Sequence, residues 1–373
     1  MNNIEAATLY LCRCVLNSTS ADASELSDID LDSLYKFCEY HSVTAMICYA
    51  LESAGIKHQQ FLQAKEKAIR KNLLLDTERK RIQKFLNEEH IWNMPLKGVV
   101  LKELYPRLGM RQMSDNDILF DAEKRSEVSA FMKKSGYELL NASDLYCKEW
   151  LKKPVYNFEM HFALFAPGGN AAFYKYYKDI FSKLIRVDND GYEYKFSDED
   201  FYLYTLAHAY KHYCIVGSGI RTLIDFYVYL TKKGDQLDWE YISAELEKLG
   251  LTDYEALMRN TALHTFGSGS ELSTEEEEAL EYMIGSGTYG TNQNFIKKSA
   301  KLLKADSKAE YVFRRIFPNM AFFRKYYPIT EKYPFLVPFV WVYRMIHALL
   351  HRGDLIKSEV SAIKTIDNDD LKK

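Results

Sequence analysis

The sequence predicts an α+β protein in which a small domain of strands and helices is embedded between two helical regions. Apolar residues recur at helical spacing before residue 89 and again after residue 197. Between these points, short apolar runs alternate with Gly, Pro, Asn and Asp, which is typical of a small α/β unit. We therefore expect an N-terminal helical region over 1–88, an α/β domain over 89–196 and a C-terminal helical domain over 197–373.

The N-terminal region is expected to be helical from Leu31 to Glu89, with one break at Gly55. Its stretch from Gln59 to Asn87 contains neither proline nor glycine, the residues that most often interrupt helices. In the central region the expected elements are, in chain order, a strand over Ile91–Leu96, a short helix from Lys97 to Leu104, a strand over Gln112–Phe120, a helix over Ala122–Lys134, and strands beginning at Tyr137 and Val155.

Apolar residues recur at helical spacing again after Ser197. The segments Ser197-Asp198-Glu199-Asp200 and, further on, Ser273-Thr274-Glu275 are typical of helix starts. Near the end, the segment from Pro334 to Leu350 is apolar and aromatic but includes Arg344 and His347. It is short and charged for a membrane span. This composition favours a buried helix over a helix lying on a membrane surface.

The bulk composition describes an ordinary globular chain. Of its 373 residues, 47% are hydrophobic, and the formal net charge is −3, so no global positive field attracts nucleic acid or an anionic membrane. The six cysteines lack the spacing of a zinc or redox motif, and the first residues lack the form of a signal peptide. We therefore expect a cytoplasmic protein with no membrane partner.

The most informative motif is a pair of carboxylates two residues apart, Asp115 and Asp117, followed directly by the apolar run Ile118-Leu119-Phe120. On a strand this spacing directs both side chains to one face. An isolated Asp-x-Asp is usually a polar turn, but carboxylates beside a buried strand are costly unless a cation pairs with them. The motif therefore predicts a Mg²⁺ site that also binds substrate phosphates.

Two further segments suit this chemistry. At Lys97-Gly98 a strand runs into a glycine and a helix start, a turn whose backbone N–H groups can hold phosphate. Lys97 and Arg111 can supply positive charge there. In the strand from Val155 to Phe165, alternation puts Glu159 and His161 on one face, opposite Phe158 and Met160, so Glu159 is a candidate third acid of the metal site. An edge strand with a solvated polar face is the simpler alternative.

Two helical pairs complete the candidates. His208 and His212 stand at i, i+4, a spacing that can bind metal, although packing or substrate contact is favoured because no third ligand is evident nearby. Arg221 and Asp225 have the same spacing, so an intrahelical ion pair is expected, and a phosphate contact by Arg221 is the alternative.

Taken in order, these motifs resemble the uncharacterised nucleotidyltransferase family of the polymerase-beta-like superfamily. The residues that carry the resemblance are Leu96-Lys97-Gly98, Tyr105-Pro106, Arg111, Asp115-x-Asp117, Gly136-Tyr137, the strand with Glu159 and His161, Leu206-x-His208-x-x-x-His212, Gly219-x-Arg221-x-x-x-Asp225, Arg315-x-Phe317-Pro318 and Pro338-x-x-Trp341-x-x-Arg344. The late matches are far less specific than the Asp115-x-Asp117 strand.

The resemblance implies a mixed-sheet domain in which Asp115, Asp117 and Glu159 bind Mg²⁺ or Mn²⁺ around a nucleoside triphosphate, with Gly98 as the turn. It also implies transfer of a nucleoside monophosphate to an acceptor hydroxyl, and Glu159 is the acid that activates that hydroxyl. Gly98 is followed by Val99, where the superfamily usually has Gly or Ser, and the interval from Gly98 to Asp115 is longer than its common spacing.

Two alternatives remain open at this point: a catalytically inactive nucleotide-binding or interaction module, and a two-metal phosphohydrolase. The sequence specifies neither the acceptor, which can be RNA, a protein or a small molecule, nor the oligomeric state.

Overall fold

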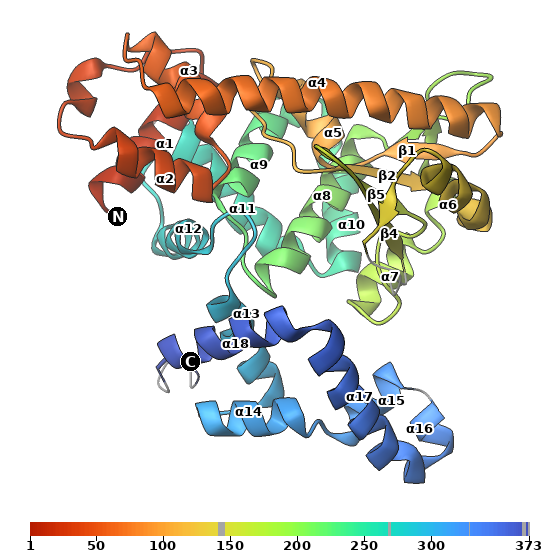
Figure 1. Ribbon diagram of the computed structural model, residues 1–373. Helices are drawn as coiled ribbons and strands as arrows, with labels where there is room; N and C mark the ends of the chain where they lie inside the picture. The colour runs from red at the N-terminus through yellow and green to blue at the C-terminus, as the bar shows by residue number, and fades with distance from the viewer. Residues whose placement is uncertain (141–145, 268–269, 328, 368–370, 372–373) are drawn as a thin grey trace. The chain divides into compact units, whose positions relative to one another are not determined.

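The computed structural model describes residues 1–140, 146–267, 270–327, 329–367 and 371. The chain forms two compact units: the first consists of residues 1–210 and 219–288, and the second of residues 211–218 and 289–373. The expected α+β fold with a small mixed sheet and flanking helices is confirmed (Figure 1). The boundaries proposed for three domains remain a proposal.

Four N-terminal helices precede the sheet: α1 (Asn3–Leu16), α2 (Leu31–Tyr40), α3 (Thr44–Ser53) and α4 (Gln59–Glu88). Helix α1 was not among the expected elements. Helix α4 runs 30 residues without interruption, as the absence of proline and glycine predicts. Its buried residues Phe61, Ala68, Leu75 and Ile82 recur every seven positions, and Leu86 follows four positions later, so they form one stripe along the helix.

The central sheet has five strands: β1 (Asn93–Pro95), β2 (Asn116–Phe120), β3 (Glu138–Leu139), β4 (Cys147–Lys152) and β5 (Tyr156–His161). Their order is β1-β2-β5-β4-β3, and β2 and β5 are parallel whereas the other neighbours are antiparallel. Between the strands lie the short α5 (Gly98–Leu101), η2 (Lys102–Leu104), η3 (Ala122–Lys124) and α6 (Arg125–Lys134). Strand β4 was not among the expected elements.

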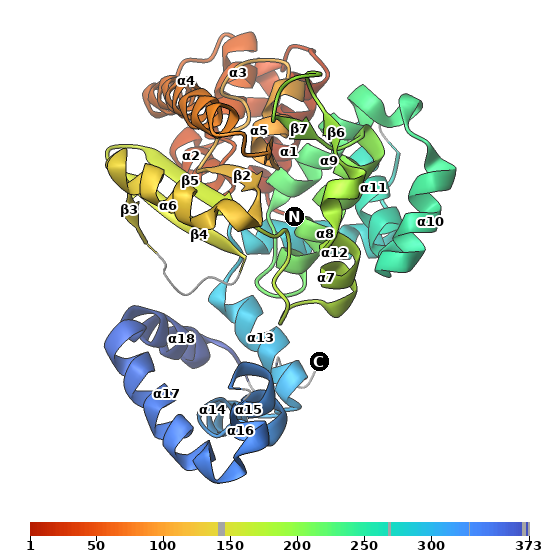
Figure 2. The ribbon, with the colours of Figure 1, turned by 90° about the vertical axis from the view of Figure 1, so that its right-hand side faces the viewer.

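One face of this sheet builds the core of the domain. Ile118, Phe158 and Met160 from the strands pack in one cluster with Leu75 and Ile82 of α4, joined by Val128 and Met132 of α6. Figure 2 shows α6 lying against the sheet. The predicted alternation of β5 is confirmed because Phe158 and Met160 are almost completely buried. The opposite face of β5 is left for Asn157, Glu159 and His161.

After the sheet the first unit continues with helices and one small hairpin. Its elements are α7 (Ala171–Tyr177), η4 (Ile180–Lys183), β6 (Ile185–Arg186), β7 (Tyr194–Lys195), α8 (Asp198–Tyr213), α9 (Ile220–Lys233), η5 (Gly234–Gln236), α10 (Trp239–Leu249), α11 (Thr252–Phe266) and α12 (Thr274–Ser286). The two predicted helix starts are confirmed: α8 begins at Asp198, and the side chain of Ser273 caps α12 in a capping box with Glu276.

The second unit is helical, with α13 (Asn292–Leu303), α14 (Lys308–Ile316), α15 (Met320–Tyr326), α16 (Ile329–Lys332), η6 (Pro334–Leu336), α17 (Val337–His351) and α18 (Gly353–Thr365). The expectation that Pro334–Leu350 is a buried helix is wrong, because α17 has no buried residue. The small core of this unit instead forms around Ile296, Ala300 and Tyr311. Among the residues that the structure describes, no helix has both the length and the apolar character to cross a bilayer.

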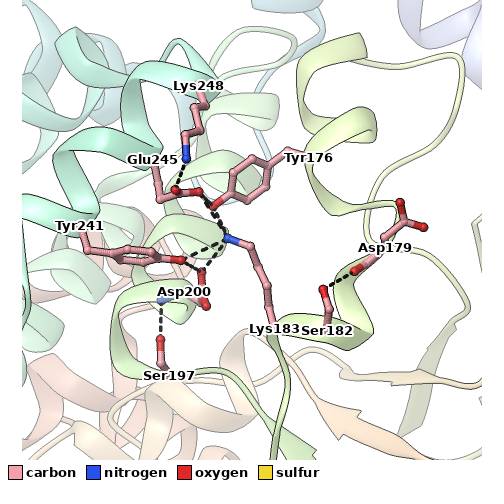
Figure 3. Close-up of polar contacts among 9 residues, drawn as sticks. All are labelled: Tyr176, Asp179, Ser182, Lys183, Ser197, Asp200, Tyr241, Glu245 and Lys248. Carbon is pink, nitrogen blue, oxygen red and sulfur yellow. Dashed lines mark hydrogen bonds and ion pairs between the residues drawn. The ribbon is translucent and has the colours of Figure 1, made fainter.

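A polar network fastens the segment after the sheet to the helices around it (Figure 3). The ammonium of Lys183 in η4 donates to the hydroxyl groups of Tyr176 at 2.7 Å and Tyr241 at 3.1 Å. It also lies 3.3 Å from a carboxylate oxygen of Asp200 and 3.3 Å from one of Glu245. One lysine thereby joins α7 and η4 to α8 and α10.

Replacing this lysine is expected to destabilise the first unit. In Lys183→Met two largely buried carboxylates lose their shared cation, and we expect the free energy of unfolding to fall by roughly 1–3 kcal/mol. Urea denaturation measures the loss. Lys178→Met is the matched control, because the Lys178 side chain is 54% exposed beside Asp179 and its loss is expected to cost little. Equal stability of the two variants would contradict a structural role for the network.

A buried histidine makes the stability depend on pH. His41, at the end of α2, is fully buried, and burial lowers its pKa from 6.5 to about 4. Between these values the unfolded chain binds a proton that the folded chain does not. Stability is therefore expected to fall as the pH decreases from 6.5 to 4, by on the order of 3 kcal/mol, and this contribution levels off below pH 4.

The measurement is urea denaturation at several pH values between 4 and 7. His41→Phe removes the titrating group while keeping a ring between Phe37 and Tyr40, so its stability should depend less on pH in this window. The exposed His90 provides the control, and His90→Asn should keep the pH dependence of the wild type. An unchanged slope in His41→Phe would show that other groups cause it.

Candidate active site

The parallel pairing of β2 and β5 brings the predicted acids together. Asp117 of β2 lies directly beside Glu159 of β5, and Leu119 lies beside His161 two residues further along. Residues that lie directly opposite on paired strands point to the same face. Asp117, Glu159 and His161 therefore share the face opposite the core, and Asp115 immediately precedes β2.

Four side chains from three segments meet on this face. The ammonium nitrogen of Lys97 lies 2.5 Å from Oδ1 of Asp117 and 3.6 Å from Oε2 of Glu159. The Nε2 atom of His161 lies 2.9 Å from the same Asp117 oxygen and 3.1 Å from the same Glu159 oxygen. Two carboxylates thus share one ammonium and one imidazole in a tight polar cluster.

The charges in this cluster shift one another's ionisation. Burial alone would raise the pKa of Asp117, but the ammonium of Lys97 and the hydrogen bond with His161 outweigh it and hold that pKa well below its usual range. Burial raises the pKa of Asp115 to about 6, and the negative charges of Asp117 and Glu159 add to the increase. Carboxylates therefore repel one another here despite the single ammonium.

The backbone at Lys97 is strained. Its φ angle is +49°, a region that side-chain-bearing residues rarely adopt and that costs of order 1–3 kcal/mol. Such strain persists only where the surrounding structure holds the residue in place. The residue with this strained backbone is the one whose ammonium lies between Asp117 and Glu159.

A protein-family model described as uncharacterised nucleotidyltransferase matches residues 27–267, which include α2 to α11 and the whole five-stranded sheet. The chain belongs to this family. No curated protein and no solved structure matches.

The acidic cluster of this family member suits a divalent cation. Asp115, Asp117 and Glu159 offer the oxygen ligands that Mg²⁺ prefers. Burial and the negative charges of Asp117 and Glu159 raise the pKa of Asp115, and a bound cation would favour the ionised carboxylate. The hydroxyl of Tyr204 in α8 is buried and has no hydrogen-bond partner in the described part of the chain. Burial raises the pKa of this hydroxyl, and the charges of Lys97, Asp117 and Glu159 also act on it. A buried polar group without a partner fits a site that a charged ligand completes.

The geometry gives Arg111 a structural partner. Its Nε and Nη2 atoms donate to the two carboxylate oxygens of Asp225 at 2.8 and 2.9 Å, and the hydroxyl of Tyr105 donates to the same group at 2.6 Å. Asp225, which was expected to pair with Arg221 one helical turn away, thus pairs with a residue more than 100 positions distant. A Cβ atom on Gly98 would lie 2.3 Å from Nη1 of Arg111, so a larger residue at position 98 would displace the guanidinium that pairs with Asp225.

The remaining candidates are Arg221, His208 and His212, and they differ in how they relate to the acidic cluster. Arg221 donates to the backbone oxygen of Gln112 at 3.3 Å, and its charge partly opposes the rise in the pKa of Asp115. The His208 ring lies 6.1 Å from that of Tyr204, one turn along α8. His212 belongs to the second compact unit. Neither histidine is in a group of three or more metal-binding side chains found within the described residues.

Two residues near the site were missed in the sequence. Lys71 of α4 donates to the backbone oxygen of Ser114 at 3.0 Å, and burial lowers its pKa while the charge of Asp115 opposes that shift. Tyr204 is the other. Lys71 lies among many other charged residues of α4, and Tyr204 among several tyrosines of α8, so no local pattern distinguished them.

Proposed function

We propose that the protein transfers a nucleoside monophosphate from a nucleoside triphosphate to an acceptor hydroxyl. The observation that supports this most is the convergence of Asp117 and Glu159, from two parallel strands, on the ammonium of Lys97. Family membership supports nucleotide transfer in general. The carboxylates of Asp115, Asp117 and Glu159 would hold Mg²⁺, or Mn²⁺ in its place.

When bound, such an ion neutralises phosphate charge and lowers the pKa of an attacking hydroxyl. The residues of the chain then have distinct roles. Glu159 is proposed to accept the proton of the acceptor hydroxyl, because its side chain is 29% exposed whereas that of Asp117 is only 6% exposed. An incoming acceptor meets the more exposed carboxylate first.

The positive charges around the acids are proposed to bind the triphosphate. Lys97 supplies an ammonium at the cluster itself, and Arg221 and Lys71 both lie within electrostatic range of Asp115. His161 holds the carboxylates of Asp117 and Glu159 in position through its contacts with both. Arg111 is left out of the proposed nucleotide contacts, because Asp225 occupies its guanidinium bidentately.

The test is incubation of the protein with each radiolabelled nucleoside triphosphate and Mg²⁺ or Mn²⁺ in cell extract, followed by identification of the class of molecule that becomes labelled. We expect label on one class together with release of pyrophosphate. Release of inorganic phosphate without labelled product would instead support a two-metal phosphohydrolase. Calorimetric nucleotide binding with neither product would support an inactive binding module.

A further inference from the structure

A sulfur atom lies beside the acidic cluster and is not used in the proposed reaction. Cys147 of β4 pairs directly with His161 of β5, so the two side chains are on the same face of the sheet as Glu159. The Cys147 sulfur, a ring nitrogen of His161 and a carboxylate oxygen of Glu159 all lie within 4.8 Å of one another. Cys147 and His161 are 5% and 2% exposed.

We propose that Cys147, Glu159 and His161 form a binding site for a thiophilic divalent transition-metal ion of the Zn²⁺ class. Thiolate, imidazole and carboxylate are the ligand types that Zn²⁺ and Co²⁺ take in proteins, whereas Mg²⁺ prefers oxygen alone. Three ligand atoms this close can converge on one ion with small side-chain movements. Metal binding replaces the thiol proton of Cys147 with a metal–sulfur bond and releases that proton to solvent.

A further observation supports the site beyond the spacing of the three ligands. His161 is nearly completely buried, and its Nδ1 atom has no hydrogen-bond partner among the described residues, which is unusual for a buried polar atom. Oδ1 of Asp117 lies 2.9 Å from Nε2 of His161, but Asp117 is outside the group of three mutually close ligands found among the described residues. Three protein ligands leave the fourth position of the tetrahedral coordination of Zn²⁺ to a water molecule.

The site has a consequence for activity that rests on the proposed function. Glu159 belongs both to this site and to the proposed Mg²⁺ site, so one carboxylate cannot serve both ions fully. A Zn²⁺-class ion held by the Cys147 sulfur is therefore expected to compete with Mg²⁺ and to inhibit nucleotide transfer. Cys147 has no role in the proposed transfer, so we expect it to affect only the choice of metal.

Cobalt spectroscopy of the full chain tests binding without any nucleotide. Titration of metal-free protein with Co²⁺ is expected to produce the near-ultraviolet absorption band of a thiolate–cobalt bond. Cys147→Ser should lose this band and weaken Zn²⁺ binding by more than about tenfold, measured by competition with a chromogenic chelator. Cys38→Ser is the matched control, because Cys38 is also fully buried and should leave both readouts unchanged.

A wild-type protein without the band, or a Cys147→Ser variant that keeps it, would overturn the proposal. If Cys147→Ser does not fold, as judged by circular dichroism, His161→Gln provides the second variant and should weaken Zn²⁺ binding. In the transfer assay with Mg²⁺, Zn²⁺ should inhibit the wild type at lower concentration than it inhibits Cys147→Ser. A cobalt band without nucleotide transfer would refute the proposed function alone, and transfer without the band would refute the metal site alone.

Discussion

Asp117→Asn is expected to reduce nucleotide transfer by at least about 10³-fold while the protein remains folded. Asp117 is 5% exposed and contacts both Lys97 and His161, so it is the acid at the centre of the cluster. Asparagine keeps the size of the side chain but removes the negative charge that a divalent cation requires. Lys97 also has Glu159 as a partner at 3.6 Å in the wild type, so we expect a limited destabilisation.

The measurement is the initial rate of label transfer from a radiolabelled nucleoside triphosphate, with the thermal midpoint recorded for each protein. Asp179→Asn is the matched control, because the Asp179 side chain is 84% exposed and lies outside the cluster, so its rate should equal that of the wild type. Transfer by Asp117→Asn at the wild-type rate would remove this carboxylate from the mechanism. A variant that fails to fold would be examined as Asp117→Ser at lower temperature, with the same expected loss.

The sequence predicted the acidic cluster because its residues carry local patterns. Asp115 and Asp117 precede a run of three apolar residues, and Glu159 alternates with the buried Phe158 and Met160. Alternation determines which face of the strand each side chain occupies. The order of the motifs, which resembles that of the nucleotidyltransferase family, then suggests that the strands of Asp117 and Glu159 are neighbours. The pairing of Asp117 with Glu159 is the contact that these patterns implied.

Elements without a local pattern were missed. Strand β4 reads Cys-Lys-Glu-Trp-Leu-Lys, and only Cys147 and Trp150 of its six residues are buried, so it lacks the alternation of a half-buried strand. Helix α17 shows the opposite problem. An apolar segment indicates that the side chains can be buried, but not that neighbouring helices cover them, and here the core of the second unit forms elsewhere.

The pair Arg111 and Asp225 illustrates why local spacing does not reveal distant contacts. Arg221 stands one helical turn from Asp225, and this local spacing favoured an ion pair between them. Arg111 approaches the same carboxylate from a loop after η2 and places two nitrogens against its two oxygens. A bidentate buried pair forms wherever the fold brings the partners together, and no sequence interval predicts that position.

Asp225→Ala is accordingly expected to lower the free energy of unfolding by about 3–5 kcal/mol, because it leaves the guanidinium of Arg111 buried without its partner. Arg111 and Asp225 have side chains only 9% exposed, so water cannot replace the lost contacts. Urea denaturation measures the effect, and Asp235→Ala, at an exposed position in η5, should cost less than about 0.5 kcal/mol.

The double variant Arg111→Met with Asp225→Leu decides between a structural and a nucleotide-binding Arg111. Removing both charges avoids an unpaired buried ion, so its stability should exceed that of Asp225→Ala. If Arg111 acts only through Asp225, the folded double variant should bind a nucleoside triphosphate with the Kd of the wild type in calorimetry. A Kd raised about tenfold or more, roughly 1.4 kcal/mol, would instead indicate that Arg111 contacts the phosphates, as its position in the sequence suggested.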